Sequence, residues 1–283
     1  DRIAANGKCE FVIDVAAELP LIAIMSLCGI PMEDKKRFFD WTNTMIFTED
    51  EDMSGVDGAI ASQTAAIEVY AYAASLAEKH KTHKLTDIVG ALLDGSVNDE
   101  KLTPDEFQVF FLMLIAAGNE STRSVIAHCM RLLMENPDQL QKLVDDPSLV
   151  PFAVEEALRY NPAFVQMRRT VMQDIEIQGQ QLKAGDKMVL NWQAINHDPD
   201  VFANPETFDI ERFKRNPELT SQHRAFGNGE HFCIGAHMSR LEMQVMFEEL
   251  IPRLKNPKFA APVEFVRDYF VNSIKSMHIT FDP

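Results

Sequence analysis

The chain has 283 residues and a mass of 32.0 kDa, which is enough to bury a sizeable hydrophobic core. It carries 27 Lys and Arg against 43 Asp and Glu, so its formal net charge is −16. This charge disfavours nucleic acid and anionic membranes as partners, because both bind cationic surfaces. Hydrophobic residues make up 46% and charged residues 25% of the chain, a balance that excludes intrinsic disorder.

The cellular location is predicted to be cytoplasmic. No sequence window approaches the roughly 20 apolar residues of a membrane span. The cysteines show neither Cys-x-x-Cys pairs nor regular spacing, which favours a reducing compartment and disfavours a disulfide framework or a zinc site. They are Cys9, Cys28, Cys129 and Cys233. The chain starts at Asp1 without a signal-like segment, so we expect a fragment, with a processed product as the alternative.

The first 160 residues predict helices almost throughout. Apolar residues recur at helical spacing from 12 to 22, and Gly29-Ile30-Pro31 ends this segment. A second amphipathic helix surrounds residues 38–45 and is followed by an acidic loop over 49–57. The Ala-rich stretch 60–80 is a third helix, and a short one begins near 84–87 and ends at Gly95.

The longest predicted helix begins at Thr103-Pro104-Asp105-Glu106, which has the residues of a capping box. It continues through an apolar segment, 107–117, to about Asn136, and a helix that is apolar all round is buried in a large domain. Pro137 and Pro147 mark two further helix starts, the second helix ending at Tyr160.

The pattern changes after Asn161-Pro162. Residues 174–178 alternate as a strand does, and 187–192 are predicted to be a returning strand. A final helix over 236–254 precedes a short β region. The prediction is one domain over 1–283, mainly α (α+β), with a small β region late in the chain.

The strongest chemical signal is Phe226-Gly227-Asn228-Gly229-Glu230-His231-Phe232-Cys233-Ile234-Gly235, directly before a helix. A lone Cys is usually a small buried hydrophobe. Here the glycines allow a flat ligand to approach the backbone, and the following helix start stabilises a thiolate, the axial ligand of some haem irons. This run resembles the haem-binding signature of the cytochrome P450 family, Phe-Gly-x-Gly-x-His-x-Cys-x-Gly, with every fixed position filled.

Two further motifs support the same resemblance. Glu156-Ala157-Leu158-Arg159 is usually a solvated pair, but it resembles the family's Glu-x-x-Arg, whose partners meet a later Arg, here Arg212. We expect this triad to be structural. The other motif is Ala117-Gly118-Asn119-Glu120-Ser121-Thr122. Taken alone it would indicate a helix kink or small residues that allow close packing, but it resembles the family's Ala/Gly-Gly-x-Asp/Glu-Thr-Thr in the helix that crosses the haem face.

The resemblance implies roles for the residues of this second motif. Ala117 and Gly118 would face the haem, Glu120 matches the acid and Ser121 the alcohol of a proton-delivering pair. The family usually has Thr where this chain has Ser121.

Arg169 and His231 match positions that bind the haem propionates, with the neighbouring Arg168 as a rival for Arg169. The role of His197 is not predicted. The resemblance covers essentially the whole chain, as the C-terminal two-thirds of the family fold with the N-terminal third absent.

The resemblance implies a haem-thiolate monooxygenase that inserts one atom of O2 into a C–H bond. Its cofactor would be haem b (iron protoporphyrin IX), with electrons from NAD(P)H through a ferredoxin and a ferredoxin reductase. The ferredoxin would be attracted by a basic patch on an acidic protein, with scattered surface cations as the alternative interpretation. The residues of this patch are Lys214, Arg215, Arg224 and Arg240.

The predicted substrate is a hydrophobic small molecule, by analogy with members that oxidise sterols, terpenoids or branched alkyl chains. The residues expected to line its pocket are Ile115, Ala116, Phe164, Val165, Met167 and Val271, near Asn272. Two other classes stay open: a haem protein without turnover, such as a sensor or an inactive fragment, and a haemless helical interaction protein.

Overall fold

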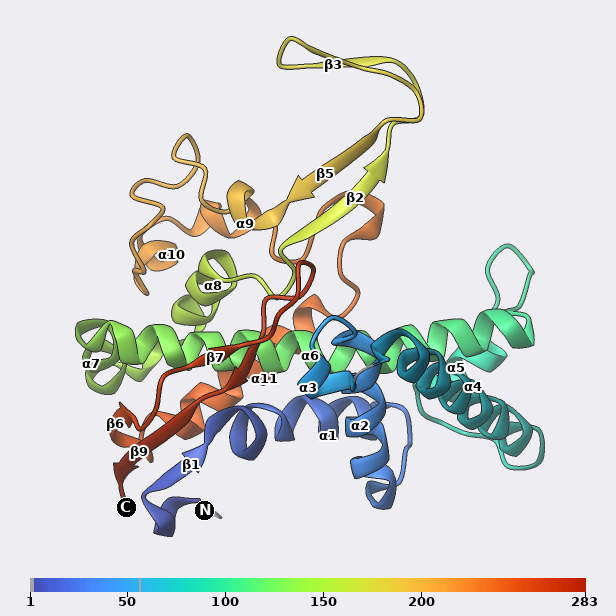
Figure 1. Cartoon of the computed structure of the whole chain (residues 1–283), viewed down its shortest axis with the longest axis horizontal. Coiled ribbons are helices and arrows are strands. Elements are labelled where there is room, and N and C mark those ends of the chain that lie inside the picture. Colours follow the sequence, from blue (N-terminus) through green and yellow to red (C-terminus); the bar gives the residue numbers. More distant parts are fainter. Residues whose placement is uncertain (1–2, 56) are drawn as a thin grey trace. The chain divides into compact units, whose positions relative to one another are not determined.

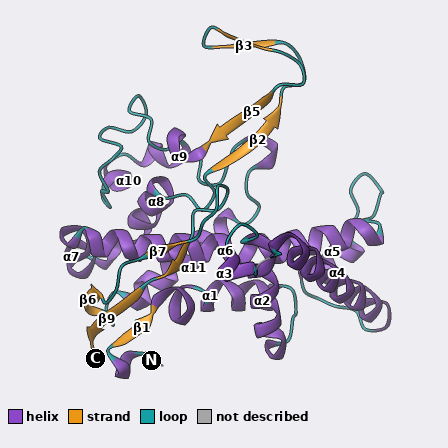
Figure 2. Ribbon diagram, in the orientation of Figure 1, coloured by secondary structure: helices purple, strands orange, loops and turns teal. Residues whose placement is uncertain are grey.

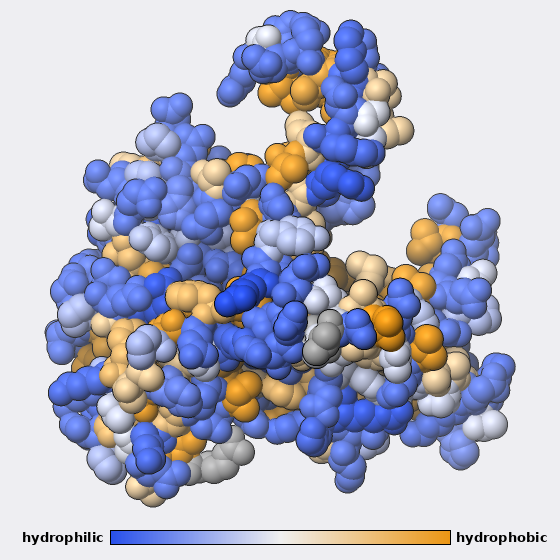
Figure 3. All heavy atoms as spheres, viewed as in Figure 1, coloured by the Kyte–Doolittle hydropathy of each residue, from blue (hydrophilic) through white to orange (hydrophobic). Residues whose placement is uncertain are grey.

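The computed structural model describes residues 3–55 and 57–283, and helices dominate it (Figure 1, Figure 2). The chain divides into two compact units, which are described separately. The first unit contains the described residues up to Ala127 together with 254–268 and 274–283, and the second contains 128–253 and 269–273. The face drawn in Figure 3 is covered mostly by hydrophilic residues, as expected for a chain of this charge.

The first unit combines a helical layer with two small antiparallel sheets. Its three-stranded sheet has the order β1-β9-β6, and β7 pairs with β8. Its helices are α1 (Glu18–Leu27), α2 (Lys35–Ile46), α3 (Glu51–Ser54), α4 (Gly58–Thr82), α5 (Ile88–Asp94) and most of α6 (Pro104–Glu135). Its strands are β1 (Lys8–Glu10), β6 (Lys255–Phe259), β7 (Glu264–Phe265), β8 (Ile274–Ser276) and β9 (His278–Asp282).

Aromatic side chains from α2, α4 and α6 form the centre of this unit. The ring of Phe38 meets Trp41 and Tyr72 edge-on, with centroids 5.1 and 5.0 Å apart. Phe107 and Phe111 from α6 are fully buried against this group. Edge-to-face aromatic pairs add to the free energy gained by burying apolar area, so α6 is fixed from its first turns onward.

The start of α6 has the predicted capping box. The backbone N–H of Thr103 donates to Glu106 Oε2 at 2.8 Å, and the Glu106 N–H donates to Thr103 Oγ1 at 3.3 Å. Among the described residues α6 alone has the length and apolar composition of a membrane span, and half of that apolar window is buried inside the protein. Core helices of soluble proteins have the same properties.

The second unit contains the end of α6 and the elements around the cysteine loop. The strands β2 and β5 form an antiparallel ladder that leads into the β3–β4 hairpin (Figure 1). The helices are α7 (Pro137–Asp145), α8 (Val150–Tyr160), α9 (Trp192–Ile195), α10 (Arg212–Arg215) and α11 (Ala236–Leu250). The strands are β2 (Gln166–Thr170), β3 (Ile175–Ile177), β4 (Gln180–Leu182) and β5 (Lys187–Asn191).

The predicted helices and the fold class are confirmed, with five local differences. The first helix begins as a π-helical turn over Val12–Ala16, the acidic loop contains α3, and α11 ends at Leu250. The returning strand β5 pairs with β2, which was not predicted because Gln-Met-Arg-Arg-Thr shows no alternation of apolar and polar residues. The early strand β1 was missed because three residues are too few for a periodicity.

Candidate functional site

The loop from Phe226 to Gly235 turns tightly and leads into α11. The N–H of Cys233 donates to the Phe226 carbonyl at 3.0 Å, which closes the loop on itself. Gly227 and Gly229 have φ angles of +74° and +72°, a region that other residues adopt only with strain. The glycines of the signature are therefore needed by the backbone as well as by any ligand close to it.

Cys233 differs from the other three cysteines in its exposure. Cys9, Cys28 and Cys129 are buried, and burial raises the pKa of the Cys9 and Cys28 thiols to about 12. Cys233 is exposed, and the partial desolvation that raises its pKa is opposed by the N–H groups of Gly235 and Ala236 and by the charge of Arg240. The pKa of Cys233 stays above its usual value, so what distinguishes this cysteine from the other three is that a ligand can reach it.

The predicted triad is brought together in the second unit. Glu156 and Arg159 are both 0% exposed, and Glu156 accepts from Arg159 Nε at 2.9 Å and from a terminal nitrogen at 2.8 Å. Arg212 Nε donates to the same carboxylate at 3.0 and 3.2 Å. One carboxylate between two guanidiniums satisfies its charge although water is excluded.

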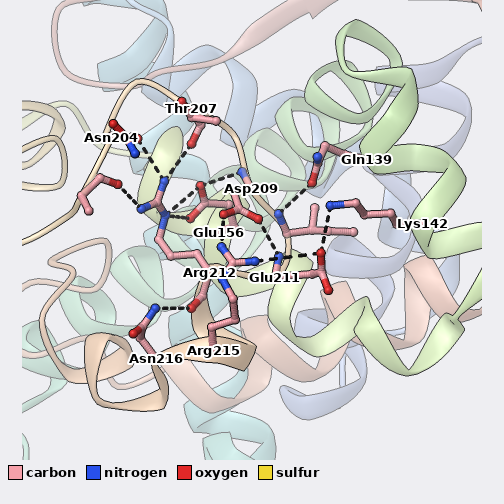
Figure 4. A network of polar contacts seen from close by, with 12 residues as sticks. Gln139, Lys142, Glu156, Asn204, Thr207, Asp209, Glu211, Arg212, Arg215 and Asn216 are labelled. Carbon is pink, nitrogen blue, oxygen red and sulfur yellow. Dashed lines mark hydrogen bonds and ion pairs between the residues drawn. The ribbon is translucent and has the colours of Figure 1, made fainter.

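Arg212 also connects this carboxylate to the irregular segment that precedes α10. Its terminal nitrogens donate to the carbonyls of Ala203 at 2.6 Å, Asn204 at 3.1 Å and Thr207 at 2.9 Å. Figure 4 shows the Arg212 guanidinium among these acceptors, beside Glu156 and Asp209. The segment has few secondary-structure hydrogen bonds of its own, so the triad determines its path.

Asn196 links the triad to the cysteine loop. Its carbonyl accepts from a terminal nitrogen of Arg159 at 2.9 Å, and its side-chain Oδ1 accepts from the N–H of Arg224 at 2.6 Å. Arg224 lies two residues before Phe226. Glu156 is thus connected to the cysteine loop through Arg159 and the buried residue Asn196, as its predicted structural role requires.

The α6 motif lies in the first unit. Glu120 is buried and forms an ion pair with Arg123, and Ser124 Oγ donates to Glu120 Oε1 at 3.0 Å. Arg123 also donates to Asn43 Oδ1 at 2.9 Å. The acid predicted from the resemblance therefore belongs to a polar cluster between α2 and α6.

The small and hydroxyl residues of the motif have local partners in α1 and α6. A Cβ on Gly118 would come within 3.0 Å of the Ile24 Cδ1 atom, so the glycine allows α1 and α6 to pack closely. Ser121 Oγ donates to the Ala117 carbonyl at 2.7 Å, one turn back along the helix. Ala117 is exposed, and the roles of these residues toward haem and oxygen stay predictions.

The remaining predicted site residues lie in three places. Ile115 is fully buried in the core of the first unit, and Ala116 is half-buried. Phe164 forms a bridge with Val271, and its ring lies 4.9 Å from that of Phe270. The Val165 N–H donates to the Phe270 carbonyl at 2.9 Å. Met167 lies on β2, opposite Leu190 of β5.

Arg168 and Arg169 are neighbours on β2 and point to opposite faces of the ladder. Arg169 is half-buried and Arg168 exposed. His231 is exposed in a short 3₁₀ turn, Gly229–His231, inside the cysteine loop. The assignment of Arg169 and His231 to the propionates stays a prediction.

Three of the four cations of the predicted basic patch are paired with carboxylates. Lys214 Nζ lies 3.7 Å from Asp146, Arg215 pairs with Asp209, and Arg240 pairs with Glu155. The positive charge that this surface offers to a partner is smaller than the sequence indicates.

Sequence reasoning missed several residues that the structure places in the site. Glu155 accepts from His223 Nε2 at 2.9 Å and from Arg240 Nε at 2.5 Å. Arg123 could have been found, because Glu120 and Arg123 repeat the Glu-x-x-Arg spacing of the triad. His223, Asn196 and Asn43 gave no signal, since their partners lie far away in the sequence.

The residues around Cys233 fit a haem group. The exposed thiol lies between Phe232 and Ile234, which are 49% and 85% exposed. A Cβ on Gly229 would meet nothing within 4 Å, so the loop is open at this position, and a Cβ on Gly235 would come within 3.8 Å of the Cys233 sulfur. A thiolate with apolar neighbours and no bulky backbone substituent suits a flat, largely apolar macrocycle with an iron centre.

Comparison with known proteins agrees with this chemistry. Residues 148–256, which contain the triad and the cysteine loop, match the model of the family described as cytochrome P450. Over 279 residues the chain is 34% identical to a steroid C26-monooxygenase of Mycolicibacterium smegmatis, covering 98% of the chain and 62% of that protein. It is 37% identical to a methyl-branched lipid omega-hydroxylase of Mycobacterium bovis, covering 98% of the chain and 63% of that protein.

Solved structures agree with the observed fold. P450BioI, in complex with an acyl carrier protein ligated to hexadec-9Z-enoic acid, is 31% identical with a TM-score of 0.90, and the match covers 99% of this chain and 71% of that one. CYP109E1 from Bacillus megaterium in complex with testosterone is 28% identical with a TM-score of 0.88, covering 100% and 75%. The chain spans less than two thirds of the length of the two curated relatives and most of the length of these solved chains. The exposed cysteine in its glycine loop, the buried triad behind it and these matches together show that the chain belongs to the cytochrome P450 family.

Proposed function

We propose that this chain forms the haem-thiolate part of a monooxygenase acting on a hydrophobic small molecule. The observation that carries the proposal is the single exposed thiol, Cys233, presented at the start of α11 by a loop closed onto Phe226. The bound haem would supply dioxygen activation, and the thiolate ligand would favour O–O cleavage. The protein contributes the position of the ligand and the shape and charge of the site.

Cys233 would hold the iron, and Arg169 and His231 would hold the propionates. An arginine fork suits a carboxylate, and Arg169 makes no ion pair among the described residues; a terminal nitrogen of its guanidinium donates to the Arg168 carbonyl at 3.0 Å. A guanidinium bound only to a neighbouring carbonyl can turn to a stronger anionic partner. This supports Arg169 over Arg168, which points to the other face of β2.

The substrate class follows from the relatives' names and from apolar residues in the second unit. The relatives are named for steroids and methyl-branched lipids. Phe164, Val165, Met167 and Val271 are apolar, and three of them lie at the junction of 164–165 with 270–271. We propose a sterol, terpenoid or branched alkyl chain as the substrate.

The electrons are proposed to come from NAD(P)H through a ferredoxin reductase and a ferredoxin, in the cytoplasm. With Lys214, Arg215 and Arg240 already paired, Arg224 is the remaining cation of the predicted patch, although its terminal nitrogen donates to the carbonyls of Ser221 and Gln222 at 2.8 Å. The attraction of an acidic partner would therefore be modest and sensitive to salt.

Glu120 and Ser121 are proposed to supply protons during oxygen activation. Ser121 lacks the methyl group that restricts a threonine hydroxyl, and its Oγ is turned back to Ala117. We expect Ser121→Ala to raise the hydrogen peroxide released per NADH consumed and to lower product, and Ser121→Thr to lower peroxide release. Glu120→Gln should slow the whole cycle. Equal coupling in Ser121→Ala and the native protein would show that Ser121 only packs.

The haem-thiolate proposal is tested with the carbon monoxide spectrum of the reduced protein. Cys233→Ala should abolish the thiolate-type band, while Cys9→Ala, Cys28→Ala and Cys129→Ala keep it, since those three thiols are buried elsewhere. Retention of the band in Cys233→Ala would overturn the assignment. A band without product formation would indicate a haem protein without turnover, and no haem binding at all would favour a helical interaction protein.

A further inference from the structure

Glu155 and Glu156 are adjacent buried carboxylates of α8 that bind different guanidiniums. Glu156 belongs to the triad with Arg159 and Arg212. Glu155 accepts from Arg240 Nε at 2.5 Å and from an Arg240 terminal nitrogen at 3.1 Å, a two-point contact with α11. His223 Nε2 lies 2.9 Å from Glu155 Oε2. The carboxylate therefore joins α8, α11 and the residue three positions before Phe226.

Arg240 is held from its other side by an aromatic ring of the cysteine loop. The guanidinium carbon lies 4.6 Å from the centroid of Phe226. Phe226 in turn accepts the N–H of Cys233 at 3.0 Å through its carbonyl. A planar guanidinium that binds a carboxylate with its edge and an aromatic ring with its face has few alternative orientations.

The charge of Arg240 lies beside the cysteine loop. Its guanidinium lies over the ring of Phe226, and the carbonyl of Phe226 accepts the Cys233 N–H, so a positive charge adjoins the contact that closes the loop. Glu155 reduces the field of this cation because it compensates the charge at hydrogen-bond distance. The pair thus places a positive charge next to the cysteine loop and a negative charge on the far side of that cation.

We propose that Arg240, held by Glu155 and His223 against Phe226, is a positioning residue that sets the reduction potential of the haem iron bound to Cys233. This inference rests on the proposed haem-thiolate function. The cation favours the added electron when the iron is reduced, and Glu155 limits how strongly it does so. The two members of the pair therefore act on the potential with opposite signs, whereas a purely structural pair would give the same defect when either member is removed.

The test is the midpoint potential of the haem in the whole chain, measured by redox titration of the haem spectrum without carbon monoxide, with the carbon monoxide spectrum of each variant recorded separately. Arg240→Gln should lower the potential and Glu155→Gln should raise it, each by about tenfold in the reduction equilibrium constant, which is about 59 mV for one electron. Glu155→Gln/Arg240→Gln should return close to the native value, and Arg240→Lys should keep more than half of the Arg effect. Arg215→Gln, an exposed cation of the same unit, is the matched control and should leave the potential unchanged.

Shifts of equal sign, or no shift, in Arg240→Gln and Glu155→Gln would overturn the inference. If Arg240→Gln does not retain haem, the sign in Glu155→Gln alone decides: a rise supports the inference, and a fall or no change overturns it. A native chain without the thiolate band would overturn the proposed function and this inference together. A native band with shifts of equal sign would overturn this inference alone.

Discussion

The described residues contain two buried Glu-x-x-Arg pairs, one in each unit, and they differ in what surrounds them. Glu156–Arg159 lies on α8 and Glu120–Arg123 on α6, and all four residues are at most 2% exposed. The spacing is identical, so both pairs lie on one face of their helix. A carboxylate and a guanidinium three residues apart can thus be buried in two different ways.

The difference is the kind of partner beyond the pair. Glu156 also accepts from Arg212 and from the Asp209 N–H, and Arg159 donates to the carbonyl of Asn196. The α6 pair meets the side chains of Asn43 and Ser124, and the Arg123 guanidinium lies over the rings of Phe39 and Phe47. The first pair fixes a long irregular segment, whereas the second joins two helices that apolar packing already holds.

The same Glu-x-x-Arg motif fixes the path of a neighbouring segment only where backbone carbonyls of that segment accept hydrogen bonds from its guanidiniums. Around α8, the carbonyls of Ala203, Asn204 and Thr207 have guanidinium donors. Around α6, the partners Asn43 and Ser124 belong to helices that satisfy their own backbone groups. A buried charge pair is by itself weak evidence for stability, and it matters more where backbone carbonyls have their donors in the pair and its neighbours.

The largest expected effect is that of Glu156→Gln. It leaves Arg159 and Arg212 buried without their carboxylate, and breaking such a pair typically costs about 3–5 kcal/mol of the free energy of unfolding. Urea unfolding followed by circular dichroism measures this loss, and haem incorporation should fall with it. Asp174→Asn, in an exposed pair with Lys183, is the control and should leave the unfolding curve unchanged. Native-like unfolding and haem loading of Glu156→Gln would show that the triad is dispensable.

Matched double variants test directly whether the two Glu-x-x-Arg pairs differ in their contribution to stability. Glu120→Met/Arg123→Met removes both charges of the α6 pair and should change the free energy of unfolding by less than about 1.5 kcal/mol, because apolar residues of similar volume can replace an isolated buried pair. Glu156→Met/Arg159→Met should prevent stable folding, since Arg212 and the Asn196 carbonyl lose their partners. Thermal unfolding of the two proteins measures the contrast. Equal losses would mean that the surrounding backbone does not distinguish the two pairs.

The smallest effect concerns Glu242 of α11, another buried carboxylate, whose Oε2 has no partner among the described residues. Burial raises its pKa from 4.5 to about 7. The folded protein therefore binds an extra proton between these values, and stability falls as the pH rises through this window. Glu242→Gln removes the penalty and should stabilise the protein by up to about 3 kcal/mol at pH 8 and by less than about 1 kcal/mol at pH 5.

Urea midpoints at the two pH values check the Glu242 prediction. Glu248→Gln, on the same helix, is the control. The same gain at pH 5 and pH 8 would show that Glu242 does not titrate in this range, and a loss at pH 8 would show that its carboxylate has a favourable partner.

Local signals in the sequence predicted much of the fold and part of the site. The capping box at Thr103, the proline at the start of α7 and the glycine-rich loop around Cys233 are each contained in a few consecutive residues. Such signals act through backbone conformation and helix termini, which depend on near neighbours. The fold class and the tight loop around Cys233 could therefore be predicted without coordinates.

Distant pairings could not be predicted in this way. Strand β1 pairs with β9 from the other end of the chain, Arg123 meets Asn43 across 80 residues, and His223 meets Glu155 across 68. No local pattern encodes such partners, because their meeting depends on how whole helices pack.

The sequence by itself determined where helices begin, which loop turns tightly and which cysteine precedes a helix. Only the tertiary structure decided which carboxylates are removed from water and which cations they pair with. Among the described residues Glu156 pairs with two guanidiniums, Glu120 pairs with that of Arg123, and Glu242 Oε2 has no partner. The physical reason is that the free energy of a buried charge depends on desolvation and on partners within a few ångströms, and packing, not sequence spacing, sets both.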